Sequence, residues 1–208
     1  MYIPPANLIS DPETIHAFMR RHSFATLITA PAGAPWATHL PFIHRAGTGH
    51  GTLASHMARA NSQWRDFDGQ EVLVIFSGPH AYVSPRWYST QPAVPTWNYA
   101  AVHAYGRARL VEDPAAVRRM LEEMISFFEG PCPAPWDGVM PEEFLEKMMR
   151  GIVAFEIPLD RLEAKFKLSQ NRSPADVHGV IHALAQSADS QETAIAEMMA
   201  QHYPGSLG

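Results

Sequence analysis

The amino-acid sequence predicts an α+β fold in which a mostly antiparallel β-sheet or β-barrel carries helices at its edges. Strand patterns come in two groups, with helical patterns before, between and after them, so strands do not alternate with helices as in a doubly wound parallel sheet. The 18 prolines and 13 glycines argue against a long helical bundle and for many short elements joined by turns. With 208 residues, 46% of them hydrophobic, we expect one domain over residues 1–208, with C-terminal helices from about residue 174.

The first part of the chain predicts one helix followed by strands. Asp11 is a capping residue and Pro12 suits the first helical position, so a helix of about three turns should begin here. Residues 24–30 and 36–44 are β-rich and flank a proline-glycine turn, which predicts a hairpin. A glycine-rich turn then leads into a short strand at residues 52–56.

The middle of the chain holds the longest strand patterns. Residues 71–77 form a nearly continuous apolar run, which is typical of a strand covered on both faces. Gly78 and Pro79 predict a turn, after which residues 81–83 continue the sheet. Residues 99–112 alternate well enough for a long strand. Capping residues and apolar periodicity predict the remaining elements: helices that begin at Asp113, Pro141, Ser173 and Asp189, and strands at residues 151–157 and 162–168.

Charge and cysteine content exclude several classes of protein. Lys and Arg number 16 against 21 Asp and Glu, a net charge of −5, which argues against a nucleic-acid binder that works by charge alone. The chain lacks both a membrane-spanning apolar run and a secretory signal pattern, so we expect a cytoplasmic protein without a membrane partner. Cys132 is the single cysteine, so neither an intrachain disulfide nor a cysteine-built zinc site is expected.

Generic catalytic motifs are absent from the sequence. It contains no phosphate-binding P-loop, no G-x-S-x-G nucleophile elbow and no H-E-x-x-H metal motif. His178 and His182 have the i, i+4 spacing that can place two imidazoles on one helix face, but no carboxylate or cysteine partner lies nearby in the sequence. We therefore interpret these histidines as structural or surface residues and predict no metal site.

Three segments are richer in polar and aromatic residues than a hydrophobic core requires. The first, residues 55–64, places hydroxyl, imidazole, guanidinium and amide groups directly after a strand, and an arginine fork beside short donors suits a phosphate. Its alternative is a solvated loop with an ordinary surface arginine. The candidate residues of this segment are Ser55, His56, Arg59 and Asn61.

The second and third segments suggest an aromatic ligand and an anion. Trp97, Asn98 and Tyr99 can stack on a flat heterocycle while the amide contacts its edge, although an aromatic cluster that closes the sheet is the alternative. Residues 165–172 combine three cations with three polar side chains in an acidic chain, which suits an anion; a strand end with snorkelling lysines is the alternative. The candidates here are Lys167, Gln170, Asn171 and Arg172.

Four longer motifs carry a family resemblance. In order they are S-H-M-A-R-A-N, V-L-V-I-F-S-G-P-H-A-Y-V-S-P, V-P-T-W-N-Y followed by V-H-A-Y-G, and K-L-S-Q-N-R. With the opening M-Y-I-P-P, they make the chain from Met1 to about Leu184 resemble the PaiB-like FMN-binding negative transcriptional regulators. The resemblance implies a split β-barrel related to the pyridoxamine phosphate oxidases and flavin reductases, and a homodimer with FMN at its interface.

The resemblance also implies roles for the three segments. It places Ser55, His56, Arg59 and Asn61 at the FMN phosphate. It turns Trp97, Asn98 and Tyr99 toward the ring system or its entrance, and it brings Lys167, Gln170, Asn171 and Arg172 to the flavin from the partner subunit. It identifies no general base or other catalytic residue. The chain departs from the family pattern at Ser62, Arg86 and Ala164, of which Arg86 adds bulk and charge near the expected site.

Several functions are compatible with this pattern. The first is an FMN-binding homodimer that acts as a negative transcriptional regulator, a flavin-dependent sensor or an oxidoreductase on a small-molecule ligand. The alternatives are a haem-binding split-barrel protein and an enzyme of the pyridoxamine phosphate oxidase type. Direct repression by DNA binding is disfavoured, because the net charge is −5 and no helix-turn-helix pattern is present.

Overall fold

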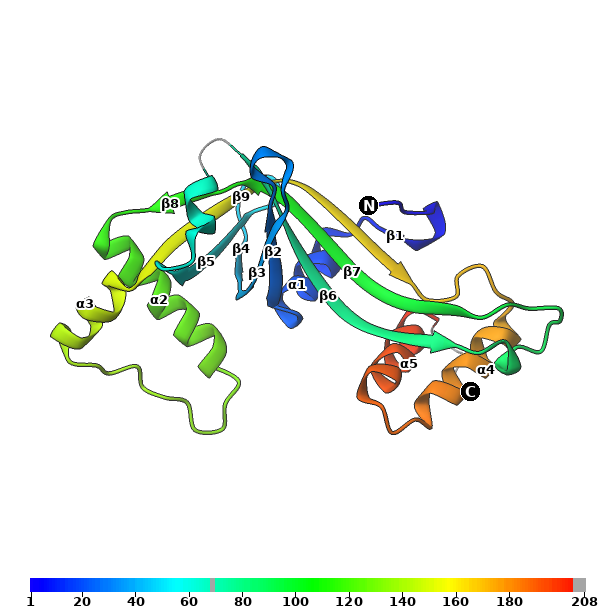
Figure 1. Ribbon diagram of the computed structural model, residues 1–208. Coiled ribbons are helices and arrows are strands. Elements are labelled where there is room, and N and C mark those ends of the chain that lie inside the picture. Colours follow the sequence, from blue (N-terminus) through cyan, green and yellow to red (C-terminus); the bar gives the residue numbers. More distant parts are fainter. Residues whose placement is uncertain (68–69, 204–208) are drawn as a thin grey trace. The chain divides into compact units, whose positions relative to one another are not determined.

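A nine-stranded sheet dominates the computed structural model, which describes residues 1–67 and 70–203. The strand order is β3-β2-β6-β7-β9-β5-β4, and both β1 and β8 also pair with β9 (Figure 1). The strands are β1 Leu8–Ile9, β2 Phe24–Thr29, β3 Trp36–Pro41, β4 Ile43–Arg45, β5 Thr52–Ala58, β6 Glu71–Val83, β7 Thr96–Arg107, β8 Arg109–Val111 and β9 Ile152–Lys167. The α-helices are α1 Pro12–Arg21, α2 Pro114–Glu129, α3 Glu142–Arg150, α4 Pro174–Ala185 and α5 Ser190–His202.

The predicted helix starts are confirmed, and three of them, at Asp113, Ser173 and Asp189, depend on a local capping interaction, whereas α3 follows Pro141 without a side-chain cap. The carboxylate of Asp113 accepts hydrogen bonds from the backbone N–H groups of the second and third residues after it. Ser173 accepts from the N–H of Asp176 at 3.2 Å, and Asp189 accepts from the N–H of Gln191 at 2.7 Å. These bonds satisfy N–H groups that the first helical turn leaves without a partner.

The predicted hairpin is confirmed for β2 and β3, which pair in antiparallel register from Phe24 opposite Pro41 to Thr29 opposite Trp36. The predicted strand over residues 36–44 is interrupted at Phe42. The side chain of Phe42 is almost completely buried, and after it β4 leaves β2 and pairs with β5.

Two predicted breaks are wrong, because β6 and β9 run without interruption. The expected turn at Gly78 and Pro79 lies inside β6. The register of β6 with β2 covers only Leu73–Ile75, so the missing N–H of Pro79 costs no hydrogen bond to β2. The segments expected at residues 151–157 and 162–168 are both parts of β9.

The chain divides into two compact units. Unit 1 comprises Met1–Ile15, Ser77–Val102 and Glu163–Gly208, of which the structure describes residues up to 203, and unit 2 comprises His16–Phe76 and His103–Leu162. The strands β6, β7 and β9 each continue from one unit into the other.

The core of unit 2 forms where α2 packs on β4, β5 and β9. Its buried members are Ile43, Ala54, Val117, Met120, Met124 and Ala154. Phe155 of β9 lies opposite Ser55 of β5 and Leu110 of β8 and makes edge contacts with two other phenylalanine rings. The glycine of the V-H-A-Y-G motif, Gly106, also has a physical explanation: a Cβ there would lie 2.1 Å from the carbonyl oxygen of Pro158.

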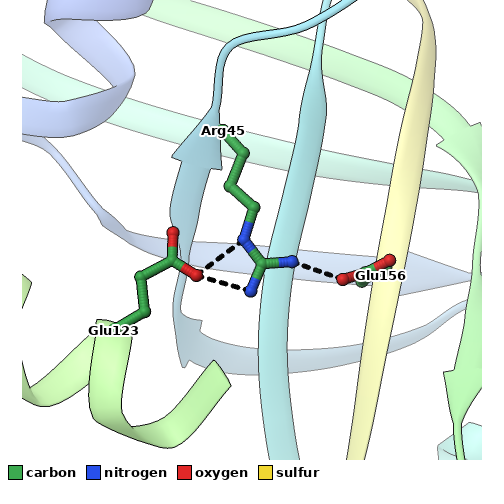
Figure 2. Close-up of polar contacts among 3 residues, drawn as sticks. All are labelled: Arg45, Glu123 and Glu156. Carbon is green, nitrogen blue, oxygen red and sulfur yellow. Dashed lines mark hydrogen bonds and ion pairs between the residues drawn. The ribbon is translucent and has the colours of Figure 1, made fainter. Parts of the chain in front are cut away.

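Unit 2 also contains a charged cluster that joins three elements (Figure 2). Arg45 of β4 donates from Nε to Oε2 of Glu123 on α2 at 2.8 Å, and its Nη2 lies 2.6 Å from the same oxygen. Its Nη1 contacts the carboxylate of Glu156 on β9. Burial opposes the charge on Arg45, but the two carboxylates outweigh it and raise the pKa of the guanidinium.

In unit 1, α4 and α5 lie side by side (Figure 1). Their apolar faces are buried, as Val180, Leu184, Ile195 and Met199 show. Asp176 near the start of α4 is also buried, and its Oδ1 accepts hydrogen bonds from Ser89 and Thr90. Burial alone would raise the pKa of this carboxyl, but the hydrogen bonds outweigh burial and lower its pKa.

Residues 1–67 and 70–203 contain neither a candidate membrane-spanning helix nor a candidate metal cluster. None of the helices there is both long and apolar enough to cross a bilayer. No group of three or more His, Cys, Asp or Glu side chains in this part of the chain is placed to hold a metal ion. His178 and His182 are both exposed on α4.

Candidate functional site

The first predicted segment lies in unit 2, at the end of β5. Ser55 is completely buried, and its hydroxyl donates to the carbonyl oxygen of Pro41 at 2.7 Å, so it stabilises the sheet from inside. His56 lines a cavity of about 750 Å³, together with apolar side chains of α2 and α3. Burial lowers the pKa of His56 and thereby favours its neutral imidazole.

Arg59 is held by the backbone of two neighbouring elements. Its Nε donates to the carbonyl oxygen of Arg150 at 2.9 Å, and its Nη2 donates to that of Ile152 at 2.7 Å. The third nitrogen, Nη1, has no hydrogen-bond partner within residues 1–67 and 70–203. Arg59 lines a cavity of about 590 Å³ with Trp64 and Arg150, so its guanidinium is fixed and still able to donate.

Both the oxygen and the nitrogen of the Asn61 side-chain amide form hydrogen bonds with other residues of the chain. Its Oδ1 accepts from the N–H of Gln63 at 3.1 Å and caps a short 3₁₀ turn, Ser62–Asp66. Its Nδ2 donates to the hydroxyl of Thr38 at 3.0 Å. Asn61 therefore shapes the turn that follows Arg59.

The second and third predicted segments meet in unit 1. Lys167, the last residue of β9, donates from Nζ to the hydroxyl of Thr96 and to the carbonyl oxygen of Trp97. Asn98 donates from Nδ2 to the hydroxyl of Ser169 at 2.9 Å. Two segments about 70 residues apart thus build one site.

A small cavity of about 190 Å³ lies between these segments, and we name it the Lys167 pocket. It is lined by Tyr88, Val94, Pro95, Thr96, Asn98, Lys167, Ser169, Asn171 and Arg172. The lining contains two cations and no acidic residue. The guanidinium of Arg172 lies over the ring of Tyr88, 4.2 Å from its centroid.

The positive charges of the Lys167 pocket are not neutralised by the chain. No carboxylate of the described residues forms a salt bridge with Lys167 or Arg172. Burial lowers the pKa of Lys167, and repulsion from Lys165 and Arg172 lowers it further. An anion in the pocket would relieve this repulsion.

The other predicted residues of unit 1 do not line this pocket and have different roles. The amide of Gln170 bonds to the backbone of its own segment: its Oε1 accepts from Leu168 and its Nε2 donates to Phe166. The ring of Tyr99 lies 5.2 Å from Nζ of the buried Lys165.

Trp97 is 53% exposed, and its ring stacks on His80 with 5.9 Å between centroids. Its indole thus offers an aromatic face beside the backbone carbonyl that Lys167 contacts. Arg86 is exposed and donates to the hydroxyl of Ser84 within its own turn, and it does not line the pocket.

Five lining residues of the pocket were not among the predicted site residues: Tyr88, Val94, Pro95, Thr96 and Ser169. Ser169 lies inside the K-L-S-Q-N-R motif, so the motif itself could have indicated it. It has a left-handed backbone with φ of 68°, which a residue other than glycine rarely adopts. Tyr88 lies about 80 residues away from this motif, and only the tertiary structure brings it there.

Each unit, taken by itself, contains groups that suit a part of a flavin mononucleotide. A phosphate dianion needs fixed N–H donors, and the Nη1 of Arg59 is one, in a cavity that Glu112 and Glu146 also line. The Lys167 pocket offers two cations and no acidic residue. A planar ring system needs an exposed aromatic face, which Trp97 offers.

Comparison with known proteins identifies the family. A family model described as "Putative FMN-binding domain" matches residues 1–161. The chain belongs to this FMN-binding family. The PaiB-like resemblance and FMN as the family's cofactor are thereby confirmed.

The individual relatives agree with this assignment. The chain is 39% identical over 203 residues to protease synthase and sporulation protein PAI 2 of Bacillus subtilis, an alignment that covers 96% of each chain. It is similar in structure to the FAD and heme binding protein of Mycobacterium smegmatis, with TM-score 0.61, 16% identity and coverage of 77% and 73% of the two chains. It is also similar to the flavocytochrome Anf3 of Azotobacter vinelandii, with TM-score 0.60, 19% identity and coverage of 75% and 67%. These two likenesses concern the fold, which is the predicted split β-barrel.

Proposed function

We propose that this protein is a homodimer that binds FMN at its interface and acts as a flavin-dependent sensor in negative regulation, without contacting DNA itself. Bound FMN supplies redox chemistry that none of the amino-acid side chains provides. The observation that carries the proposal is a fixed guanidinium with a free donor, Arg59, in a chain whose family binds FMN.

Arg59 suits the phosphate end of the cofactor. Two backbone carbonyls hold its guanidinium, so little conformational freedom is lost when Nη1 donates to a phosphate oxygen. The cavity beside it, about 590 Å³, lies in the size range of small-molecule sites, which is about 300–1,000 Å³. The exposed indole of Trp97 suits the ring system.

The surface charges support an indirect effect on transcription. Arg118 and Arg119, one of two adjacent cationic pairs in the sequence, contact Glu142 and Asp113 respectively. A homodimer would carry a net charge of −10, twice the −5 of one chain. Phosphate-backbone binding requires a concentration of unpaired cations, and these arginines do not supply it.

Exposed apolar side chains support a homodimer. Tyr2 is 83% exposed, and Phe24 and Val94 are each 68% exposed. A subunit interface that covered such side chains would remove apolar surface from water. Sedimentation equilibrium at micromolar concentration should give twice the mass of one chain, and a stable monomer would contradict the interface site.

The experiment that tests the proposal is an absorbance spectrum of the protein after incubation with excess FMN and desalting. We expect a retained flavin spectrum, which Arg59→Ala abolishes and Arg59→Lys weakens, because lysine keeps the charge and loses the planar fork. Arg65→Ala is the matched control, since Arg65 is exposed in the adjacent turn and does not line the 590 Å³ cavity.

Three outcomes would overturn parts of the proposal. No retained flavin in the wild-type chain would exclude FMN binding by this protein. A Soret band in place of the flavin bands would indicate haem, the alternative ligand. A gel shift showing sequence-specific DNA binding at moderate salt would contradict the indirect role in transcription.

A further inference from the structure

We infer that the Lys167 pocket binds a small oxyanion that carries its own hydrogen-bond donor, as a ligand separate from FMN. The inference rests on the proposed function in one respect, since this ligand is then the substrate or signal of a flavin-binding protein. It assigns Lys167, Asn171 and Arg172 to the second ligand, whereas the family resemblance implied that they contact FMN.

The size of the pocket sets the first limit on the ligand. Its volume of about 190 Å³ lies below the roughly 300 Å³ at which sites for drug-sized ligands begin. It therefore admits a phosphate or a small carboxylic acid and excludes a whole flavin nucleotide.

The charge of the pocket sets the second limit. Lys167 and Arg172 both line it, Lys165 is near enough to repel Lys167, and no acidic residue contributes to the lining. Tyr88 supports the guanidinium of Arg172 from one side, so the arginine is oriented without being neutralised. The cavity therefore favours a ligand with negative charge.

Asn98 adds a requirement that a bare anion does not meet. Its side chain is completely buried and lines the pocket, and its Oδ1 has no hydrogen-bond partner within the chain. Its Nδ2 donates to Ser169 at 2.9 Å and to the sulfur of Met199 at 3.4 Å, which fixes the amide with its oxygen left over. A buried acceptor without a partner is costly, and an anion oxygen beside it would repel it.

The ligand must therefore bring a donor along with its charge. Hydrogen phosphate carries an O–H beside its anionic oxygens, and a small hydroxy acid carries a hydroxyl beside its carboxylate. Sulfate has anionic oxygens like those of hydrogen phosphate, and acetate has a carboxylate like that of the hydroxy acid. Neither sulfate nor acetate carries a hydrogen-bond donor at neutral pH. The pocket should distinguish the members of each pair.

The backbone of Ser169 is a second sign that this pocket is a built site. Among the described residues, it is the non-glycine residue with a positive φ, and its hydroxyl is the group that orients Asn98. Strained backbone of this kind concentrates where a side chain must be held for a ligand.

The experiment is isothermal titration calorimetry, in which anions are titrated into the FMN-loaded protein at pH 7 and constant ionic strength. Inorganic phosphate should bind once per chain and sulfate at least about tenfold more weakly, because one hydrogen bond to a charged ligand is worth that much. Glycolate against acetate repeats the comparison for carboxylates and tells which acid group the pocket prefers.

Matched variants test whether phosphate binds in the Lys167 pocket or to positive charge elsewhere on the protein. Arg172→Gln should weaken phosphate binding at least about tenfold. Arg161→Gln is the control, since Arg161 also lies over a tyrosine ring, that of Tyr105 at 3.5 Å, but belongs to unit 2. FMN content is measured by absorbance in the same samples, and thermal unfolding checks that each variant is folded.

The outcomes distinguish this inference from the proposed function. Equal affinity for phosphate and sulfate would overturn the inference, and so would loss of FMN together with phosphate in Arg172→Gln. Neither result would contradict the proposal that the wild-type protein binds FMN. A wild-type chain that retains no FMN but binds phosphate with the expected preference would contradict the proposed function and support the pocket.

Discussion

The two units place cations in opposite surroundings. In unit 2, Arg45 lies between the carboxylates of Glu123 and Glu156, which neutralise it (Figure 2). In unit 1, Lys167 and Arg172 share a pocket whose lining holds no acid. The pKa of Arg45 is raised and that of Lys167 is lowered, so the same kind of charge is stabilised in one place and destabilised in the other.

This difference distinguishes a cation whose charge the chain pairs with carboxylates from cations whose charge it leaves unpaired. Arg45 joins β4 to α2 and β9, and its charge is fully used by the chain. Lys167 is already anchored by Thr96 and the carbonyl of Trp97, neither of which removes its charge. A protein gains no stability from concentrating unpaired charges, which is why such a pocket indicates binding.

The largest expected effect comes from giving the pocket the acid that it lacks. Asn171 is exposed and lines the pocket, so Asn171→Asp adds a carboxylate with little risk to folding. We expect phosphate affinity, measured by titration calorimetry, to fall by about tenfold or more, because the new charge repels the anion and neutralises the cations. Asn171→Ser is the uncharged control, and unchanged affinity in Asn171→Asp would contradict the comparison.

The next largest effect concerns the charged cluster of Arg45, Glu123 and Glu156. Arg45→Met should lower the free energy of unfolding by about 1 kcal/mol, since the two acids it contacts are partly exposed and such pairs contribute modestly. Urea denaturation measures this, with Arg20→Met at an exposed position as the control. Phosphate and FMN binding should not change, and a loss of either would show that Arg45 is more than a structural residue.

The smallest effect is a dependence of stability on pH. Because the pKa of Lys167 is lowered in the folded state, the unfolded chain binds more protons between that pKa and about 10.5. The free energy of unfolding of ligand-free protein should therefore rise with pH across this window relative to Lys167→Met. Urea midpoints of the two proteins measure the difference, and parallel curves would argue against unpaired charge at Lys167.

Phosphate should reverse this relation, since a bound anion favours the charged lysine and restores its pKa. Binding should then weaken as pH rises through the same window. In Lys167→Met this part of the pH dependence should be absent.

How well the sequence predicted the structure also differs from one element to another. The helices that begin after Asp113 and Ser173 were predicted correctly, because a capping side chain acts within three residues of itself. The break predicted at Gly78 and Pro79 was wrong, because whether a proline interrupts a strand depends on what lies beside it. The sequence around Pro79 does not show which strand lies beside it.

The sequence by itself determined the chemical character of the protein. Local capping, apolar periodicity and the polar segments at residues 55–64, 94–99 and 165–172 are properties of short stretches of chain, and the motifs they contain established the family.

Only the tertiary structure decided which groups meet. It directed Arg59 to the carbonyls of Arg150 and Ile152, turned the amide of Gln170 onto its own backbone, and brought Tyr88 to Arg172. It also left Lys167 without a carboxylate among the described residues. Whether a charge or a donor is satisfied depends on neighbours brought together by folding, often from distant parts of the chain.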